Sequence, residues 1–174
     1  MPSKESLQAI DVALNNELRE HQFYLQHAQR TRNPVGKAMF QRIGEEELEH
    51  YRRLQELHEK WKKKEKWPET VPLQVANTNV RDALLGVLKK VEQQPVSDAD
   101  DLAAIRTAID FEYRGVAFYG KLGDMVTDPK EKQFFALLSG IEKEHALSLQ
   151  DAELFLTDPE SYYRQIEHHT LDGV

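Results

Sequence analysis

The feature of this 174-residue chain that most constrains its fold is a pattern of polar residues that occurs twice. Each copy has a glutamate, a tyrosine seven positions later, and a Glu-x-x-His segment that starts 30 positions after the first glutamate. The first copy is Glu17, Tyr24, Glu47 and His50, and adding 95 to each number gives the second copy, Glu112, Tyr119, Glu142 and His145. The same offset relates Phe40 to Phe135. We interpret the chain as an internal duplication.

The spacing of apolar residues predicts an all-α chain. Apolar side chains recur every three or four positions over long stretches, as in amphipathic helices, and glycine and proline are scarce, at 8 and 7 residues. We predict long helices over residues 3–32, 36–66, 98–125 and 129–156, with turns at 33–36 and 127–129. A shorter helix is predicted over residues 79–93, with Val80, Leu84, Leu85 and Leu88 on its apolar side.

These helices predict a single domain over residues 1–174. Two helical hairpins, 3–66 and 98–157, are joined by a long crossover, 67–97, that contains the shorter helix. Prolines at 68 and 72 are expected to end the second helix, because proline lacks the N–H that a helix interior requires. Two hairpins with one long crossover form the ferritin-like version of the four-helix bundle. The tail, 158–174, is expected to contain at most a short helical piece, and it includes His168 and His169, to which the sequence assigns no role.

The paired glutamates interrupt apolar stripes. Glu47, for example, lies four residues after Ile43 and seven before Leu54. A buried carboxylate without a partner is very costly, so four of them in one core require strong positive charge. Two divalent metal ions would supply that charge. The six predicted ligands are Glu17, Glu47, His50, Glu112, Glu142 and His145.

The spacing also suits metal coordination. Residues three apart share a helix face, so the glutamate and histidine of each Glu-x-x-His segment can reach one site together. Each metal would have one terminal glutamate and one histidine, with two glutamates bridging. Mixed carboxylate and imidazole ligation suits iron or manganese, and zinc is a further candidate. The chain has no cysteine, which excludes thiolate zinc sites, iron–sulfur clusters, disulfides and cysteine nucleophiles.

Four segments resemble the bundle domain of rubrerythrins, which are di-iron members of the ferritin-like superfamily. They are ELREHQFY at 17–24, EEELEH ending at His50, EYRGVAFY at 112–119 and IEKEH ending at His145, and the resemblance covers nearly the whole chain. It implies two iron ions on the six predicted ligands, and peroxide reduction or ferroxidase activity. It also implies that Tyr24 and Tyr119 donate hydrogen bonds to ligating carboxylates, a contact that tunes metal sites.

The chain departs from the rubrerythrin pattern in two respects. Without cysteine we expect no rubredoxin-like iron domain, so the resemblance then implies an external electron donor. Rubrerythrins also carry an extra glutamate three residues after the first ligand of the third bundle helix, where this chain has Gly115. The corresponding position in the first half holds Glu20, which is a candidate extra ligand or a surface charge.

Other ionisable residues beside the pattern are not predicted to be ligands. His21 is expected to be a packed or partly exposed side chain. Glu45, Glu46, Glu49 and Glu144 are expected to face water or a neighbouring helix of the bundle. No acid–base residue apart from the six ligands is evident.

We therefore predict a non-haem di-iron oxidoreductase that reacts with hydrogen peroxide or dioxygen. The alternatives are an iron storage or delivery protein of the ferritin type, and a bundle in which the metal is only structural. A homodimer is expected for the enzyme, and a cage-forming oligomer for storage.

Charge and hydropathy set the remaining expectations. The formal net charge of -7 argues against general binding to nucleic-acid phosphates. No apolar run approaches the roughly 18 residues of a membrane span, and the first residues lack the apolar core of a signal peptide. We expect a cytoplasmic protein with neither nucleic-acid nor membrane partners.

Overall fold

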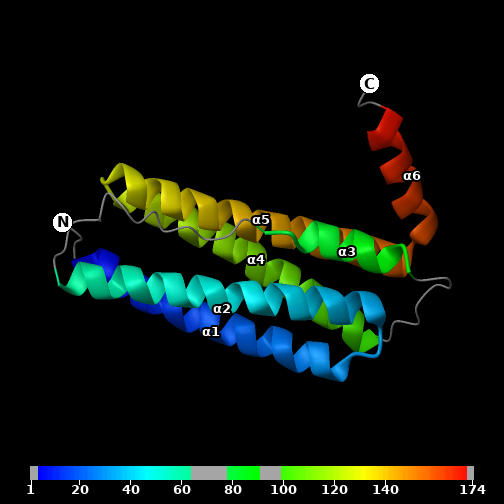
Figure 1. The fold of residues 1–174 in the computed structure, drawn as a ribbon, viewed down its shortest axis with the longest axis horizontal. Coiled ribbons are helices and arrows are strands. Elements are labelled where there is room, and N and C mark those ends of the chain that lie inside the picture. Colours follow the sequence, from blue (N-terminus) through cyan, green and yellow to red (C-terminus); the bar gives the residue numbers. More distant parts are fainter. Residues whose placement is uncertain (1–3, 64–77, 91–98, 172–174) are drawn as a thin grey trace.

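The computed structural model describes residues 4–63, 78–90 and 99–171, and the side chains of this part except those of residue 5 and residues 166–171. Within these ranges every regular element is an α-helix, which confirms the predicted all-α class (Figure 1). The elements are α1 (Lys4–Arg30), α2 (Pro34–Lys62), α3 (Val80–Leu88), α4 (Ala99–Met125), α5 (Pro129–Thr157) and α6 (Pro159–Leu171). None of the described helices is both long and apolar enough to span a membrane.

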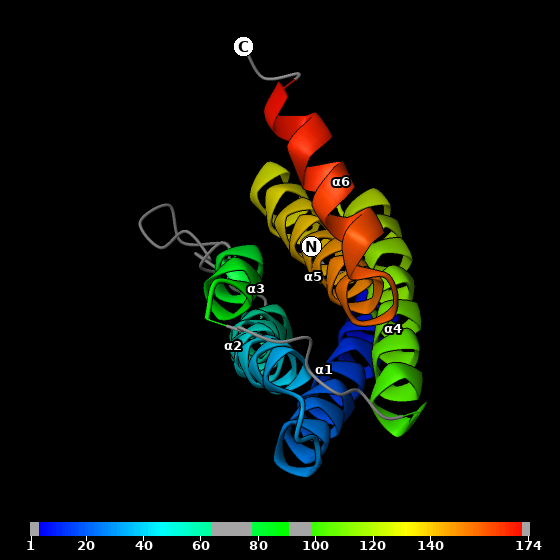
Figure 2. The same ribbon diagram turned by 90° about the vertical axis from the view of Figure 1, so that its right-hand side faces the viewer.

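The four long helices form the predicted ferritin-like bundle. Helix α1 packs along α2, and α4 packs along α5, while contacts of α1 with α4 and of α2 with α5 join the two hairpins (Figure 1). Helix α3 lies on the outside of the bundle against α2 and α5, so the α1–α4 side is left without this cover (Figure 2). Helix α6 packs against α5 and extends away from the bundle.

The second helix of each hairpin starts with the same device. The side chain of Asn33 accepts hydrogen bonds from the backbone N–H groups of Val35 and Gly36, at 2.9 and 3.1 Å. Asp128 does the same for α5, and each cap is followed by a proline at the first helical position. Such a cap satisfies N–H groups that the first turn leaves unpaired, and proline there loses no hydrogen bond. Because 128 is 33 plus 95, the duplication extends to the helix caps.

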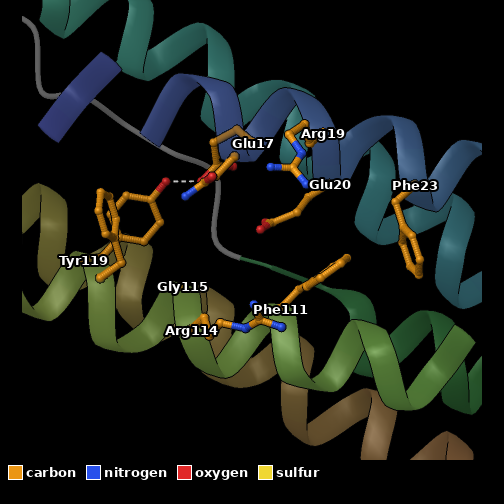
Figure 3. A pocket seen from close by; sticks show the side chains of 10 residues that line it. Glu17, Arg19, Glu20, Phe23, Phe111, Arg114, Gly115 and Tyr119 are labelled. Carbon is orange, nitrogen blue, oxygen red and sulfur yellow. Dashed lines mark hydrogen bonds between the residues drawn. The ribbon is translucent and has the colours of Figure 1, made fainter. Parts of the chain in front are cut away.

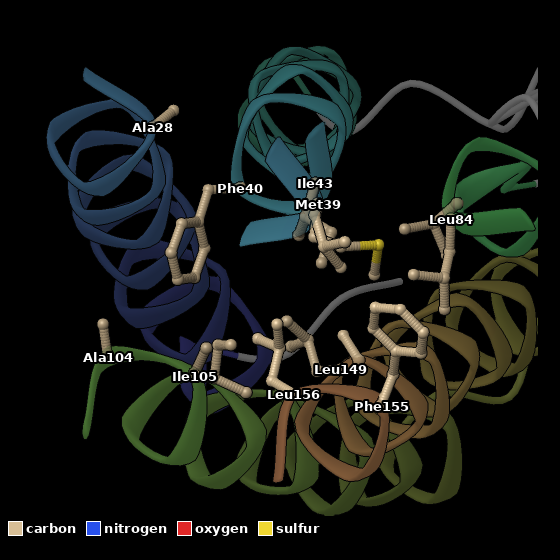
Figure 4. Close-up of a cluster of buried hydrophobic side chains, with 14 of the residues drawn as sticks. Ala28, Met39, Phe40, Ile43, Leu84, Ala104, Ile105, Leu149, Phe155 and Leu156 are labelled. Atoms are coloured by element: carbon tan, nitrogen blue, oxygen red, sulfur yellow. The ribbon is translucent and has the colours of Figure 1, made fainter. Parts of the chain in front are cut away.

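Two apolar clusters fill the bundle, one on each side of its middle. One cluster includes Phe40, Ile105 and Leu149 (Figure 4), and the other includes Leu54 and Phe135. Along each long helix, residues of one cluster are followed by predicted ligands and then by residues of the other cluster. The packed ends therefore leave a polar layer in the middle of the bundle.

Several element boundaries differ from the predictions. Helix α1 ends at Arg30 rather than residue 32, and helix α2 ends at Lys62 rather than residue 66. Helix α2 begins at Pro34 rather than residue 36, because the predicted turn is its cap and first turn. Helix α3 ends at Leu88 rather than residue 93. The predicted tail contains α6, which starts where Oδ1 of Asp158 accepts a hydrogen bond from the N–H of Ser161.

Three predictions lie outside the described residues. They concern the crossover segments 64–77, with its prolines, and 91–98, the side chains of His168 and His169, and both chain ends. The assignment of residues 1–174 to one domain stays a prediction.

Candidate metal centre

The six predicted ligands lie together in the polar layer of the bundle. Each side chain is at most 2% exposed. Their donor atoms form two groups of four, and within each group the atoms lie within 4.8 Å of one another. One group is Glu17, Glu47, His50 and Glu142, and the other is Glu47, Glu112, Glu142 and His145. Glu47 and Glu142 belong to both groups.

The ring nitrogens that face the cluster lie close to several carboxylates at once. Nδ1 of His50 is 3.0 Å from Oε2 of Glu47 and 3.3 Å from carboxylate oxygens of both Glu17 and Glu142. Nδ1 of His145 is 3.1 Å from Oε1 of Glu47 and 3.4 Å from Oε2 of Glu112. Each histidine therefore presents Nδ1 to its own group of carboxylates.

Several carboxylate oxygens and one ring nitrogen of the cluster are buried without a hydrogen-bond partner. They are Oε2 of Glu17, Oε1 of Glu47, Oε2 of Glu112, both oxygens of Glu142 and Nδ1 of His145. Buried polar atoms are nearly always paired, and leaving one unpaired costs about 1–3 kcal/mol. These lone pairs converge on a shared space and fit two cations, so the residues present are compatible with a di-metal centre.

The pKa values of the cluster are strongly perturbed. Burial, helped by the charge of Glu47, raises the pKa of Glu17 well above its usual range. Burial acts to lower the pKa of His50, but the neighbouring carboxylates, Glu47 first, outweigh it and raise this pKa well above normal. Burial likewise acts to raise the pKa of Glu47, but His50 and His145 outweigh it and lower this pKa. Without metal the cluster therefore holds protons, which metal binding would displace.

Two tyrosines tie the hairpins together through the outer oxygens of the cluster. The hydroxyl of Tyr24 donates a hydrogen bond to Oε1 of Glu112, and that of Tyr119 donates to Oε1 of Glu17. Each tyrosine therefore crosses to the glutamate of the other half. The second oxygen of each glutamate, Oε2, is left facing the cluster without a hydrogen bond. This division holds each carboxylate in place while one oxygen stays free for a metal.

Glu46 contacts the centre in a way that the sequence did not predict. It is 7% exposed, and its Oε2 lies 2.7 Å from Nε2 of His145. Its other oxygen, Oε1, accepts a hydrogen bond from Nε of Arg42 at 2.8 Å. A proton on Nε2 that is donated to Glu46 leaves the Nδ1 lone pair for a metal. Position 141, which corresponds to Glu46 in the second half, is isoleucine.

Gly115 and Glu20 account for the departure from the rubrerythrin pattern. A Cβ atom at Gly115 would lie 3.1 Å from Cγ of Glu142, so glycine makes room for this carboxylate. Glu20 extends from α1 toward α4 beside Gly115 (Figure 3) and is half-buried. Burial, with the charges of Glu47 and Glu17, raises the pKa of Glu20 to about 11. Glu20 is thus near the centre but outside both ligand groups.

His21 has a structural contact. Its Nδ1 lies 2.5 Å from the carbonyl oxygen of Gly44, on the facing helix α2. A Cβ at Gly44 would lie 3.0 Å from that of Tyr24, so glycine permits this close approach of α1 and α2.

Comparison with known proteins gives one result that bears on this arrangement. Searches among curated proteins and among solved structures gave no match. The model of the rubrerythrin family matches residues 8–153, which include both halves of the duplication and all six clustered residues. The chain therefore belongs to the rubrerythrin family.

Proposed function

We propose that the chain is a non-haem di-iron oxidoreductase that reduces hydrogen peroxide or dioxygen with electrons from an external donor. The observation that supports it most is the pair of buried donor groups that share Glu47 and Glu142. Shared carboxylates allow two metals to act as one unit. The unpaired buried atoms of these residues add support, because a merely structural network would satisfy them with hydrogen bonds.

The proposed ligand set follows from the two groups. Glu17 and His50 would hold one iron, Glu112 and His145 the other, and Glu47 and Glu142 would bridge them. When bound, the iron pair would supply the two electrons that reduction of an O–O bond requires. The chain itself buries the six ligands, holds Glu112 and Glu17 through Tyr24 and Tyr119, and directs Nδ1 of His145 through Glu46.

Glu20 is proposed as an additional carboxylate for the half-site of Glu17. It follows Glu17 by three residues on α1, so the two side chains lie on one helix face. Carboxylates that can join or leave a site help it to accommodate a change of metal charge. Glu20→Gln should alter the absorption spectrum of the oxidised centre but leave two irons bound. An unchanged spectrum would exclude Glu20 as a ligand.

The test of this function is anaerobic loading with ferrous iron, followed by rapid mixing with hydrogen peroxide or dioxygen. We expect oxidation of both irons, and repeated turnover when a chemical reductant such as reduced methyl viologen is present. A centre that binds metal but stays redox-inert would rule the function out. Light scattering should show a small oligomer such as a homodimer, whereas a cage would favour iron storage.

A further inference from the structure

A pocket of about 420 Å³ opens between α1 and α4, on the side of the bundle that α3 leaves uncovered (Figure 3). Helix α1 contributes Glu17, Glu20 and Phe23 to its lining, and α4 contributes Phe111 and Tyr119. Glu17 and Tyr119 are joined by a hydrogen bond and belong to the candidate metal centre. The pocket therefore connects the surface of the bundle to the centre.

The size of the pocket exceeds what the smallest oxidants need. A water molecule takes up roughly 30 Å³ in the liquid, and hydrogen peroxide and dioxygen are only slightly larger. Sites for small organic ligands usually have volumes of roughly 300–1,000 Å³. The pocket falls in this range, which indicates an organic molecule as its occupant.

The lining combines an aromatic wall with a positively charged rim. The rings of Phe23 and Phe111 line the pocket and pack edge to face against each other, with centroids 5.2 Å apart. The guanidinium of Arg114 lies 5.4 Å from the centroid of Phe111 and pairs with Asp110. Arg19, exposed on α1, has no ion-pair partner in the part of the chain that the structure describes. This combination suits an apolar molecule that carries one anionic group.

The charges also orient such a molecule. The two arginines of the lining, Arg19 and Arg114, are exposed, whereas Glu17 and Glu20 at the inner end of the pocket offer an anion no positive charge. Arg19 offers a charge-assisted hydrogen bond at the outer end. An anionic group would therefore lie at the rim, and the opposite end of the molecule would point toward the centre.

We propose that the pocket binds an organic hydroperoxide with an apolar body and a carboxylate, and that this is the oxidant in the proposed function, on which the inference rests. The carboxylate pairs with Arg19, the body packs on Phe23 and Phe111, and the hydroperoxide group faces Glu17. Reduction breaks the O–O bond and, with two protons and two electrons, gives the alcohol and water. Two ferrous ions held by the six ligands would supply the two electrons and become ferric, and the external donor would reduce them to the ferrous state again.

Binding can be tested apart from catalysis with an unreactive product analogue, 4-(2-hydroxypropan-2-yl)benzoate, titrated calorimetrically into metal-free and metal-loaded protein. We expect it to bind about five-fold more tightly than uncharged 2-phenylpropan-2-ol, as for an exposed ion pair. Arg19→Gln should remove this preference. Arg52→Gln, which neutralises an exposed arginine on α2 away from the pocket, should retain it. Absence of saturable binding, or an unchanged preference in Arg19→Gln, would overturn the proposal.

Turnover then separates this inference from the proposed function. Ferrous-loaded protein should reduce 4-(2-hydroperoxypropan-2-yl)benzoate with a higher kcat/KM than hydrogen peroxide, and Arg19→Gln should reduce that advantage about five-fold. If hydrogen peroxide is reduced but the aromatic ligands do not bind, the pocket inference fails and the proposed function stands. If protein with two bound irons reduces no peroxide, the proposed function fails and the substrate class fails with it.

Discussion

Nε2 of His145 lies 2.7 Å from Oε2 of Glu46, whereas the corresponding position in the other half of the duplication is Ile141. The two histidines of the centre therefore differ in the residue next to them. A carboxylate on the outer nitrogen of a ligating histidine fixes the ring and makes the inner nitrogen more basic. Two half-sites that come from a duplication should consequently bind metal unequally.

Replacing Glu46 should weaken one of the two metals. Loss of such a carboxylate lowers metal affinity by about 10- to 100-fold, so Glu46→Ala should weaken the metal at His145 by this factor and affect the metal at His50 much less. Anaerobic calorimetric titration with ferrous iron measures both affinities. Glu45→Ala, at the exposed neighbouring position, is the matched control. Unchanged affinities in Glu46→Ala would show that its contact with His145 does not support the metal.

The tyrosine hydrogen bonds should contribute to stability in the metal-free protein. Tyr24→Phe leaves Oε1 of Glu112 buried without a donor, at a cost of about 1–3 kcal/mol in the free energy of unfolding. Tyr119→Phe should cost about as much, because its hydroxyl pairs with Glu17 in the same manner. Tyr113→Phe, on the surface of α4, is the control. Urea unfolding would contradict this prediction if Tyr24→Phe and the control were equally stable.

Two glycines of α4 should respond oppositely to alanine. A Cβ atom at Gly120 would meet no neighbouring group of the described residues within 4 Å, so Gly120→Ala should raise helix stability by about 1 kcal/mol. Gly115→Ala places its Cβ 3.1 Å from Cγ of Glu142 and should move this bridging carboxylate. We expect titration with ferrous iron to show weaker metal binding in Gly115→Ala and unchanged metal binding in Gly120→Ala. Equal metal affinities in the two variants would mean that Glu142 tolerates the shift.

The stability of the metal-free protein should fall as the pH rises. Neighbouring carboxylates raise the pKa values of His50 and His145 above the ordinary 6.5, despite burial. The folded state thus binds protons more tightly than the unfolded state. The resulting stability is complete below pH 6.5 and is lost as the pH rises through the raised pKa values. The lowered pKa values of Glu47 and Glu142 act below their ordinary 4.5, outside this window.

Urea unfolding at about pH 6 and about pH 9, on either side of the histidine range, measures this dependence. Metal-free protein should be less stable at the higher pH. Metal-loaded protein should not lose stability in this way, because the ions take the place of the protons. A metal-free protein with equal stability at both values would contradict the predicted proton uptake.

The bundle and the six clustered residues could be predicted from the sequence because both follow from periodicity. A glutamate or histidine that replaces a core residue in a helical stripe must enter the core, and the duplication indicates which residues do so. Glu46 has no such signal, because it lies beside Glu47 and its direction depends on how α5 packs against α2. The pocket could not be predicted from the sequence either, since it depends on the separation of α1 from α4. Helix α6 was predicted only as a short helical piece of the tail, although Asp158-Pro159 repeats the start signal of α5.

The most direct test of the di-metal centre is the iron content of the chain after anaerobic ferrous loading and removal of unbound metal. We expect two irons per chain in the wild type and in Glu144→Ala, which alters an exposed residue of α5. Glu142→Ala removes a bridging carboxylate and should lose metal binding while its helical circular dichroism is retained. Two irons per chain in Glu142→Ala, or none in the wild type, would contradict the proposed ligand set.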